Sequence, residues 1–151
     1  MQITKMYSPD VELFVDGGSG VGATATKVRR FTTVQKNTLG SYATFTQDVN
    51  NGDKITINIP GVYAVQYSDA VNAGNDCIGI SLNASVLTTG ISSLTYAQGR
   101  RATGSSGSAS GYICTVTTLL RCVAGDIIRA QFTSITGASV ICTLKVMLVG
   151  S

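Results

Sequence analysis

The densest group of side chains that could bind an ion lies at residues 48–53, which read Asp-Val-Asn-Asn-Gly-Asp. Oxygen ligands at this spacing are typical of calcium sites. The EF-hand loop, however, needs Asp or Asn at its fifth position and Gly at its sixth, and here Gly52 occupies the fifth. Asn and Gly also tolerate the backbone of a tight turn. The pattern therefore predicts a turn, and we expect no metal and no cofactor.

Catalysis would have to rely on carboxylates, because the chain has no histidine. This excludes Ser-His-Asp and Cys-His mechanisms and histidine-ligated zinc. A pair of aspartates could still hydrolyse a glycosidic bond, and Asp69 and Asp76 could meet across a loop. The aspartates lie at predicted turns with no visible pairing, so we expect a protein that is not an enzyme.

The four cysteines are too widely spaced for a CxxC metal or redox motif. Each lies within an apolar pattern typical of a strand. This favours buried thiols over disulfides.

The charge of the chain is mildly basic, with eleven Lys and Arg against eight Asp and Glu and a pI near 8.7. The cations are dispersed apart from two pairs, Arg29 with Arg30 and Arg100 with Arg101. No aromatic platform accompanies either pair, so each is predicted to be a solvated loop or an interface contact rather than a phosphate clamp. We expect no nucleic-acid partner.

No stretch approaches the roughly 20 continuous apolar residues of a membrane span. Residues 1–10 also lack the apolar core of a signal peptide. We therefore expect no membrane partner and synthesis in a cytoplasm.

The elements that position these residues are predicted to be strands. The chain of 151 residues has seventeen Gly, a single Glu and many Thr, Ser and Val, which disfavours helices. Residues 1–27 show no steady period and contain a Gly-rich stretch, so we expect an N-terminal arm and linker there and one domain over residues 28–151.

Strands are predicted at residues 28–34 and 42–49, and alternating apolar residues predict further strands at residues 55–59, 62–70, 78–82, 112–122, 127–132 and 140–148. Residues 98–110 are small and polar and are expected to form an exposed loop that carries Arg100 and Arg101. With some eight short strands and no crossover helix, the fold class is all-β, an antiparallel two-sheet sandwich.

Three segments resemble the C1q and tumour-necrosis-factor jelly roll. Residues 57–67 read INIPGVYAVQY, residues 119–130 read LLRCVAGDIIRA, and residues 140–148 form an apolar final strand. The resemblance covers residues 28–150 and implies a ten-stranded sandwich that assembles as a homotrimer. It also implies that the following residues lie at the trimer interface or in the core: Tyr63, Tyr67, Phe132, Val140, Leu144, Val146 and Leu148.

Residues 22–32, which read GATATKVRRFT, are similar to the opening of C1q-like modules in tailed-bacteriophage virions. This resemblance implies a capsid decoration (cement) protein on the capsid exterior, made in the host cytoplasm. Its partner would be the major capsid protein, or tail proteins. The arm would grip the capsid through Tyr7, Leu13 and Phe14, because a few large side chains carry most interface energy. The alternative is the receptor-binding head of a tail fibre, which would recognise a host glycan or protein through residues 98–110.

Overall fold

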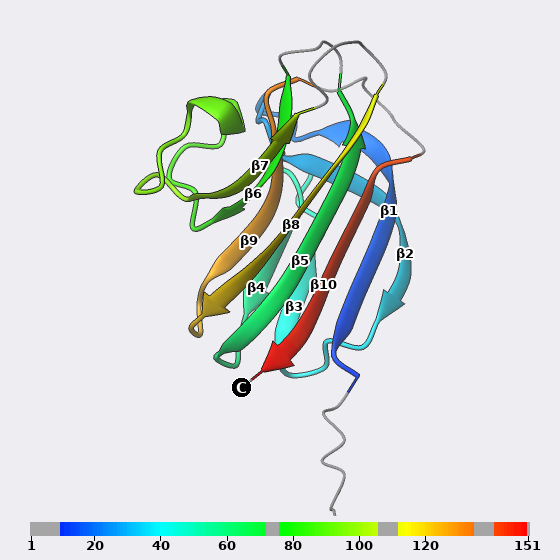
Figure 1. Ribbon diagram of the computed structural model, residues 1–151. Helices are drawn as coiled ribbons and strands as arrows, with labels where there is room; N and C mark the ends of the chain where they lie inside the picture. Colours follow the sequence, from blue (N-terminus) through cyan, green and yellow to red (C-terminus); the bar gives the residue numbers. More distant parts are fainter. Residues whose placement is uncertain (1–9, 72–75, 106–111, 135–140, 151) are drawn as a thin grey trace, which may run out of the picture.

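Two five-stranded antiparallel sheets pack face to face in the computed structural model, which describes residues 10–71, 76–105, 112–134 and 141–150 (Figure 1). The first, sheet A, has the strand order β2-β1-β10-β5-β8, and the second, sheet B, has the order β3-β4-β9-β6-β7. The strands are β1 (Glu12–Val21), β2 (Arg29–Asn37), β3 (Ala43–Thr46), β4 (Lys54–Ile57), β5 (Gly61–Ala70), β6 (Cys77–Leu82), β7 (Arg100–Ser105), β8 (Ile113–Cys122), β9 (Ile127–Phe132) and β10 (Thr143–Gly150).

The predicted all-β antiparallel sandwich is confirmed. In the described residues the one helical element is a 3-10 turn, η1 (Ile91–Ser93). No helix in this part of the chain is long and apolar enough to span a membrane.

The core forms where the inward faces of the two sheets meet. On β5, Tyr63, Val65 and Tyr67 alternate inward and are fully buried. Ile78 and Ile80 of β6 cover them from sheet B. Fully burying an apolar side chain of this size contributes roughly 1.5–3 kcal/mol, and the period-2 backbone of β5 brings all three side chains onto the same face.

The N-terminal arm is shorter than predicted, because residues 12–21 form strand β1. This strand lies between β2 and β10 in sheet A, and its Leu13 and Val15 side chains are fully buried. The prediction that residues 1–27 lie outside the domain is therefore wrong for β1. Phe14, which is half-buried on the opposite face, obscures the alternation of apolar and polar residues in the sequence.

Gly18, in the stretch predicted to be a linker, has a packing role. Gly18 lies against the guanidinium of Arg29, where an added Cβ would come within 2.4 Å of Cζ. The close approach of β1 to this buried side chain requires a residue without a side chain. A pattern that resembles a flexible linker is here part of a bulged strand.

The exposed loop predicted at residues 98–110 is also wrong in part. Arg100 and Arg101 begin β7, the edge strand of sheet B, which pairs with β6. Both side chains are half-buried. Residues 106–111 lie outside the described residues.

Candidate functional site

The outer face of sheet A carries an apolar patch that no other part of the described chain covers. β5 points Val62 and Ala64 outward, on the opposite side from the core. Strand register places Ala64 between Met147 of β10 and Leu119 of β8. Leu119 is 66% exposed and Val149 is 50% exposed.

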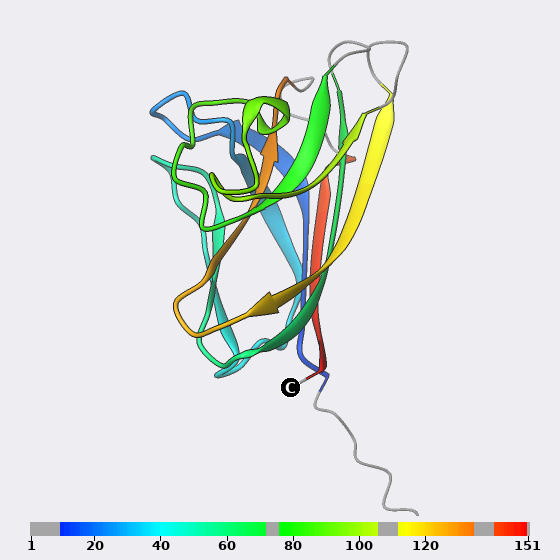
Figure 2. The ribbon, with the colours of Figure 1, turned by 60° about the vertical axis from the view of Figure 1, so that its left-hand side comes forward.

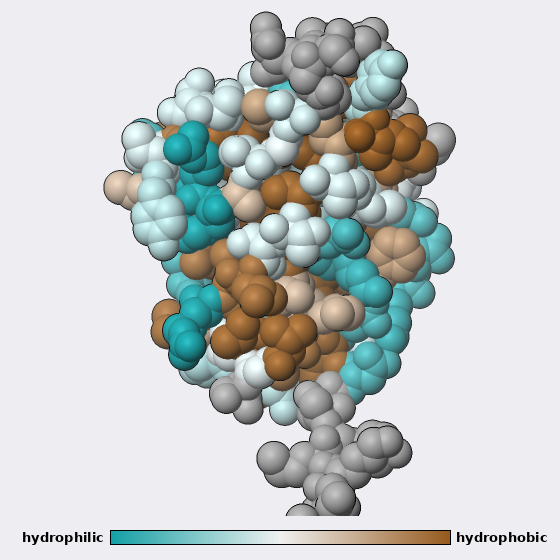
Figure 3. Space-filling view, viewed as in Figure 1, coloured by the Kyte–Doolittle hydropathy of each residue, from teal (hydrophilic) through white to brown (hydrophobic). Residues whose placement is uncertain are grey.

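We call the group Val62, Ala64, Leu119, Met147 and Val149 the apolar face. Figure 3 shows it as the brown area on the lower half of the surface in that view. A shallow depression lies beside it, lined by Ala64, Val65, Gln66, Thr117, Lys145 and Met147. Single exposed apolar residues are normal on a protein surface, whereas large contiguous apolar patches are typical of interaction sites.

Further along β5 and β8, the same surface carries uncharged polar side chains. Gln66 pairs in register with Thr117, and the hydroxyls of Ser68 and Thr115 lie 2.7 Å apart. These side chains can hydrogen-bond across an interface without the cost of burying a charge.

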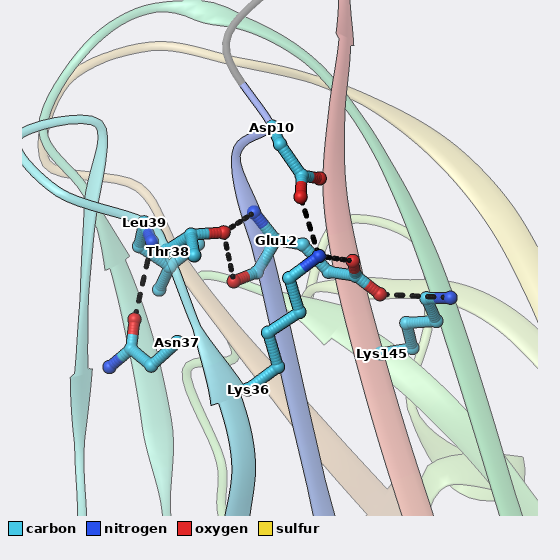
Figure 4. Close-up of polar contacts among 7 residues, drawn as sticks. All are labelled: Asp10, Glu12, Lys36, Asn37, Thr38, Leu39 and Lys145. Atoms are coloured by element: carbon cyan, nitrogen blue, oxygen red, sulfur yellow. Dashed lines mark hydrogen bonds and ion pairs between the residues drawn. The ribbon is translucent and has the colours of Figure 1, made fainter.

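Four charged residues border the apolar face on the β1 side (Figure 4). Glu12 accepts hydrogen bonds from Lys145 Nζ at 2.9 Å and Lys36 Nζ at 2.7 Å, and Lys36 Nζ also lies 2.6 Å from Asp10. The hydrogen bonds from Lys145 and then Lys36 lower the pKa of Glu12. Asp10 and then Glu12 raise the pKa of Lys36. The cluster neutralises Lys145, which lies on the outer face of sheet A between Phe14 and Gln66.

Of the residues predicted to lie at the trimer interface or in the core, those that the structure describes lie in the core. Tyr63, Tyr67, Phe132, Leu144 and Val146 are buried between the sheets, and Leu148 is partly buried against them. Their neighbours along each strand, such as Met147, are the residues that face outward. Val140 lies outside the described residues.

The three residues predicted to attach the arm to the capsid also differ in where they lie. Leu13 is fully buried and cannot contact a partner. Phe14 is half-buried on the outer face of sheet A, in register with Lys36 and Lys145. Tyr7 lies outside the described residues.

A charged cluster that the sequence did not indicate lies inside the sandwich. Arg29 Nε forms an ion pair with Asp69 Oδ2 at 2.8 Å, and neither side chain is exposed. Tyr67 Oη donates to Asp69 Oδ2 at 2.6 Å, and Arg29 Nε lies 3.2 Å from Cys142 Sγ. Arg29 is therefore not a solvated loop residue, and Asp69 pairs with a cation rather than with Asp76.

Burial determines the chemistry of this cluster. Burial first, and then the Asp69 carboxylate, raise the pKa of Tyr67 well above its usual value. The same two causes raise the pKa of Cys142 to about 12. Both groups are therefore uncharged at neutral pH, and Asp69 and Arg29 hold the only charges of the cluster. The arrangement joins β2, β5 and the residue that precedes β10, and its two charged side chains are inaccessible to a substrate.

The turn predicted at residues 48–53 is confirmed. Asp48 Oδ1 accepts the backbone N–H groups of Asn50 and Asn51, and Asp53 accepts those of Phe31 and Asp48. The carboxylates therefore stabilise the backbone of the turn through hydrogen bonds. No group of three or more His, Cys, Asp or Glu that could hold a metal occurs in the described part of the chain.

Comparison with known proteins finds similarity in structure but not in sequence. No family model and no curated protein matches the chain. Eiger TNF from S. frugiperda aligns with a TM-score of 0.58 at 13% identity, over 93% of both chains. The globular domain of zebrafish complement 1qA protein aligns with a TM-score of 0.56 at 11% identity, over 94% of this chain and 98% of that one. Murine APRIL aligns with a TM-score of 0.58 at 13% identity, over 91% of this chain and 98% of that one. The chain therefore has the C1q/TNF-like jelly-roll fold that the sequence resemblance implied.

Proposed function

We propose that this C1q/TNF-like chain is a non-enzymatic structural protein of a phage virion, which forms a homotrimer and decorates the capsid. The observation that carries the proposal is the open apolar face of sheet A. An apolar centre beside neutral polar side chains and a charged border is the usual anatomy of a protein interface.

A closed ring of three copies is one way to cover this face. In a cyclic assembly every subunit makes the same contacts with its two neighbours. The same residues are therefore buried in each copy. Leu119 and Met147 would lose their exposure to water, while the Glu12 cluster would stay at the rim. The neutralised Lys145 lowers the cost of bringing this surface close to a second copy.

The mass of the protein in solution tests the assembly. Light scattering should give three times the 15.7 kDa of one chain. Leu119→Asp places a charge on the apolar face and should give a folded monomer. Val49→Asp is the matched control, because Val49 is 56% exposed in the turn between β3 and β4 and lies outside sheet A. A monomeric wild type, or a trimer that persists with Leu119→Asp, would refute the use of this face.

The position on the capsid is supported by the similarity of residues 22–32 to phage modules and by the geometry of the chain ends. The start of β1 and the end of β10 lie at the same end of the sandwich (Figures 1 and 2), where Leu148 N donates to the carbonyl of Val11 at 3.0 Å. Contacts with the capsid at this end would leave the opposite end of the sandwich exposed. Attachment by several subunits of one trimer would act cooperatively, because each contact after the first is effectively intramolecular.

Capsid binding should be tested with a truncation that spares β1. Deletion of residues 1–9 removes Tyr7 but leaves the sheet complete, whereas deletion of residues 1–20 would remove a central strand. We expect the full chain to bind empty capsids at a fixed stoichiometry and the truncated trimer to lose binding. If the truncated trimer binds equally well, the arm is not the attachment element. If neither protein binds, the decoration proposal fails.

A receptor-binding head is the second candidate, favoured by the large exposed side chain of Tyr96 next to β7. It predicts that saturating purified protein binds host cells and blocks infection. Binding to empty capsids without any effect on infection would favour decoration.

A further inference from the structure

The connection between β6 and β7, residues 83–99, lies on the outer face of sheet B, away from sheet A (Figures 1 and 2). It is held firmly in place. Two of its own side chains, Ile91 and Leu94, are buried. Gln131 Nε2 of β9 donates hydrogen bonds to the carbonyls of Val86 and Thr89 at 3.3 and 3.1 Å. The connection therefore presents a fixed surface.

Tyr96 stands at the tip of this connection in a tight turn. Its side chain is 70% exposed, more than that of any other large hydrophobic residue in the described ranges. The turn is closed by hydrogen bonds from Gly99 N to Tyr96 O at 3.0 Å and from Thr95 N to Gln98 Oε1 at 2.9 Å. Gly99 has a φ of +104°, and a Cβ there would lie 2.7 Å from the carbonyl oxygen of Leu82, so the turn requires glycine.

Arg101 packs against one face of the Tyr96 ring and orients it. Its guanidinium carbon lies 4.1 Å from the ring centroid, and its Nη1 donates to the carbonyl oxygens of Tyr96 and Arg100 at 2.9 and 3.1 Å. A cation over an exposed aromatic ring contributes roughly 0.5–1 kcal/mol. One face of the ring is thus occupied by Arg101, and the rest of the ring is open to water.

The charge of this surface is positive and locally uncompensated. Arg100 Nη1 donates to the carbonyl of Ser92 at 3.2 Å. Within the described residues, neither Arg100 nor Arg101 forms an ion pair with a carboxylate. The other N–H groups of the two guanidinium groups have no acceptor in this part of the chain. They are therefore available to a ligand that carries acid groups.

We propose that Tyr96, Arg100 and Arg101 form a binding site for an acidic polysaccharide whose sugars carry carboxylates. The C–H face of a pyranose ring would pack on the electron-rich face of Tyr96. A uronate carboxylate would accept hydrogen bonds from the guanidinium groups, which match its planar geometry. Because the ring is already oriented, binding would cost little conformational entropy.

The surroundings favour a sugar over a protein partner. The exposed neighbours of Tyr96 in the connection are small or polar, including Ser92, Ser93 and Thr95. A stable protein interface usually buries about 800 Å² per partner around an apolar centre. A single aromatic ring with hydrogen-bonding neighbours fits one sugar ring instead.

The proposed sugar site does not depend on the trimer or on the virion location. It lies on sheet B, so assembly through sheet A would leave it exposed and repeat it on each subunit. A repeated site would strengthen binding to a polymer with repeated acid groups.

Affinity electrophoresis of the full chain tests the site, with polygalacturonate, neutral dextran or polyglutamate in the gel. We expect retardation of the wild type by polygalacturonate and none by dextran. Tyr96→Ala should weaken this binding at least tenfold. Tyr112→Ala is the matched control, because Tyr112 is 57% exposed but precedes β8 in sheet A, and it should bind like the wild type.

Arg101→Lys adds a second test, because it keeps the charge but removes the planar guanidinium. It should also weaken binding to polygalacturonate. The proposal is overturned if the wild type is not retarded, if polyglutamate retards it equally, or if Tyr96→Ala behaves like Tyr112→Ala. Light scattering on the same samples reports the trimer separately, so failure of the sugar site cannot be confused with failure of assembly.

Discussion

Arg29 and Asp69 form an ion pair of 2.8 Å in which both side chains are completely shielded from water. The two residues come from β2 and β5, which are not neighbours in sheet A. Two further groups satisfy the Asp69 carboxylate, the Tyr67 hydroxyl at 2.6 Å and the backbone N–H of Ala70 at 2.8 Å. The pair thus links separate strands beneath the sheet.

Breaking this pair from one side should strongly destabilise the protein. Asp69→Asn leaves the Arg29 charge buried without a counter-ion, which typically costs about 3–5 kcal/mol. Urea unfolding at a fixed protein concentration would measure the loss. Asp10→Asn is the control, because Asp10 is 73% exposed in its pair with Lys36, and such surface pairs contribute about 0–1 kcal/mol.

Removing both partners should cost less than removing one. The double substitution Arg29→Met with Asp69→Leu replaces two charges by apolar groups, which is often near neutral. We expect it to be more stable than Asp69→Asn alone. If the double variant is less stable than the single one, the charges themselves are required.

Gly18→Ala should destabilise the fold because its Cβ would collide with the buried guanidinium of Arg29. Overpacking of this kind costs about 1–3 kcal/mol. Gly104→Ala is the matched strand control, because the nearest atom to its Cβ would be 3.4 Å away and its φ is not positive. Equal unfolding midpoints for the two variants would contradict the proposed close approach of β1.

Cys122 and Cys142 should resist alkylation in the folded protein. Burial raises the pKa of Cys122 to about 11, and burial followed by Asp69 raises that of Cys142 to about 12. At pH 8 almost no reactive thiolate is present at either site. Peptide mapping after iodoacetamide treatment should find both unmodified in the native state and modified in guanidinium chloride. Rapid labelling of native Cys142 would show that the core opens there.

The stability supplied by Glu12 should disappear in acid. Lys145 and Lys36 hold its folded pKa below the ordinary 4.5, so its contribution is complete above that value. The contribution is lost as the pH falls through the lowered folded pKa. The contribution of Lys36 to stability depends on pH in the opposite direction. Its pKa is raised above 10.5, so its contribution is lost as the pH rises through the raised value.

The comparison of wild type with Glu12→Gln tests this sign. The wild type should unfold at a higher urea concentration at pH 7, and the two midpoints should converge in strong acid. A difference that stays constant across the acid range would show that the Glu12 charge is not the cause.

The alternation of apolar residues along β5 and β10 predicted the strands and the set of side chains that share a face. It could not show which face meets the opposite sheet and which remains on the outside of the sandwich. Both faces of these strands carry apolar residues, Tyr63 and Leu144 on one side and Ala64 and Met147 on the other. The arrangement of the second sheet decides which set is buried.

By itself, the sequence determined the fold class. Alternating apolar residues and turn-forming residues specify strands and turns within a few neighbouring positions, whatever the tertiary arrangement. Only the tertiary structure showed that Leu13 belongs to a core strand and that Arg29 is a buried ion-pair partner. Whether a charge is solvated or a strand is central depends on residues far along the chain, such as Asp69, which lies forty positions from Arg29. This contact forms only when β2, β1, β10 and β5 have assembled into one sheet, and no local pattern records it.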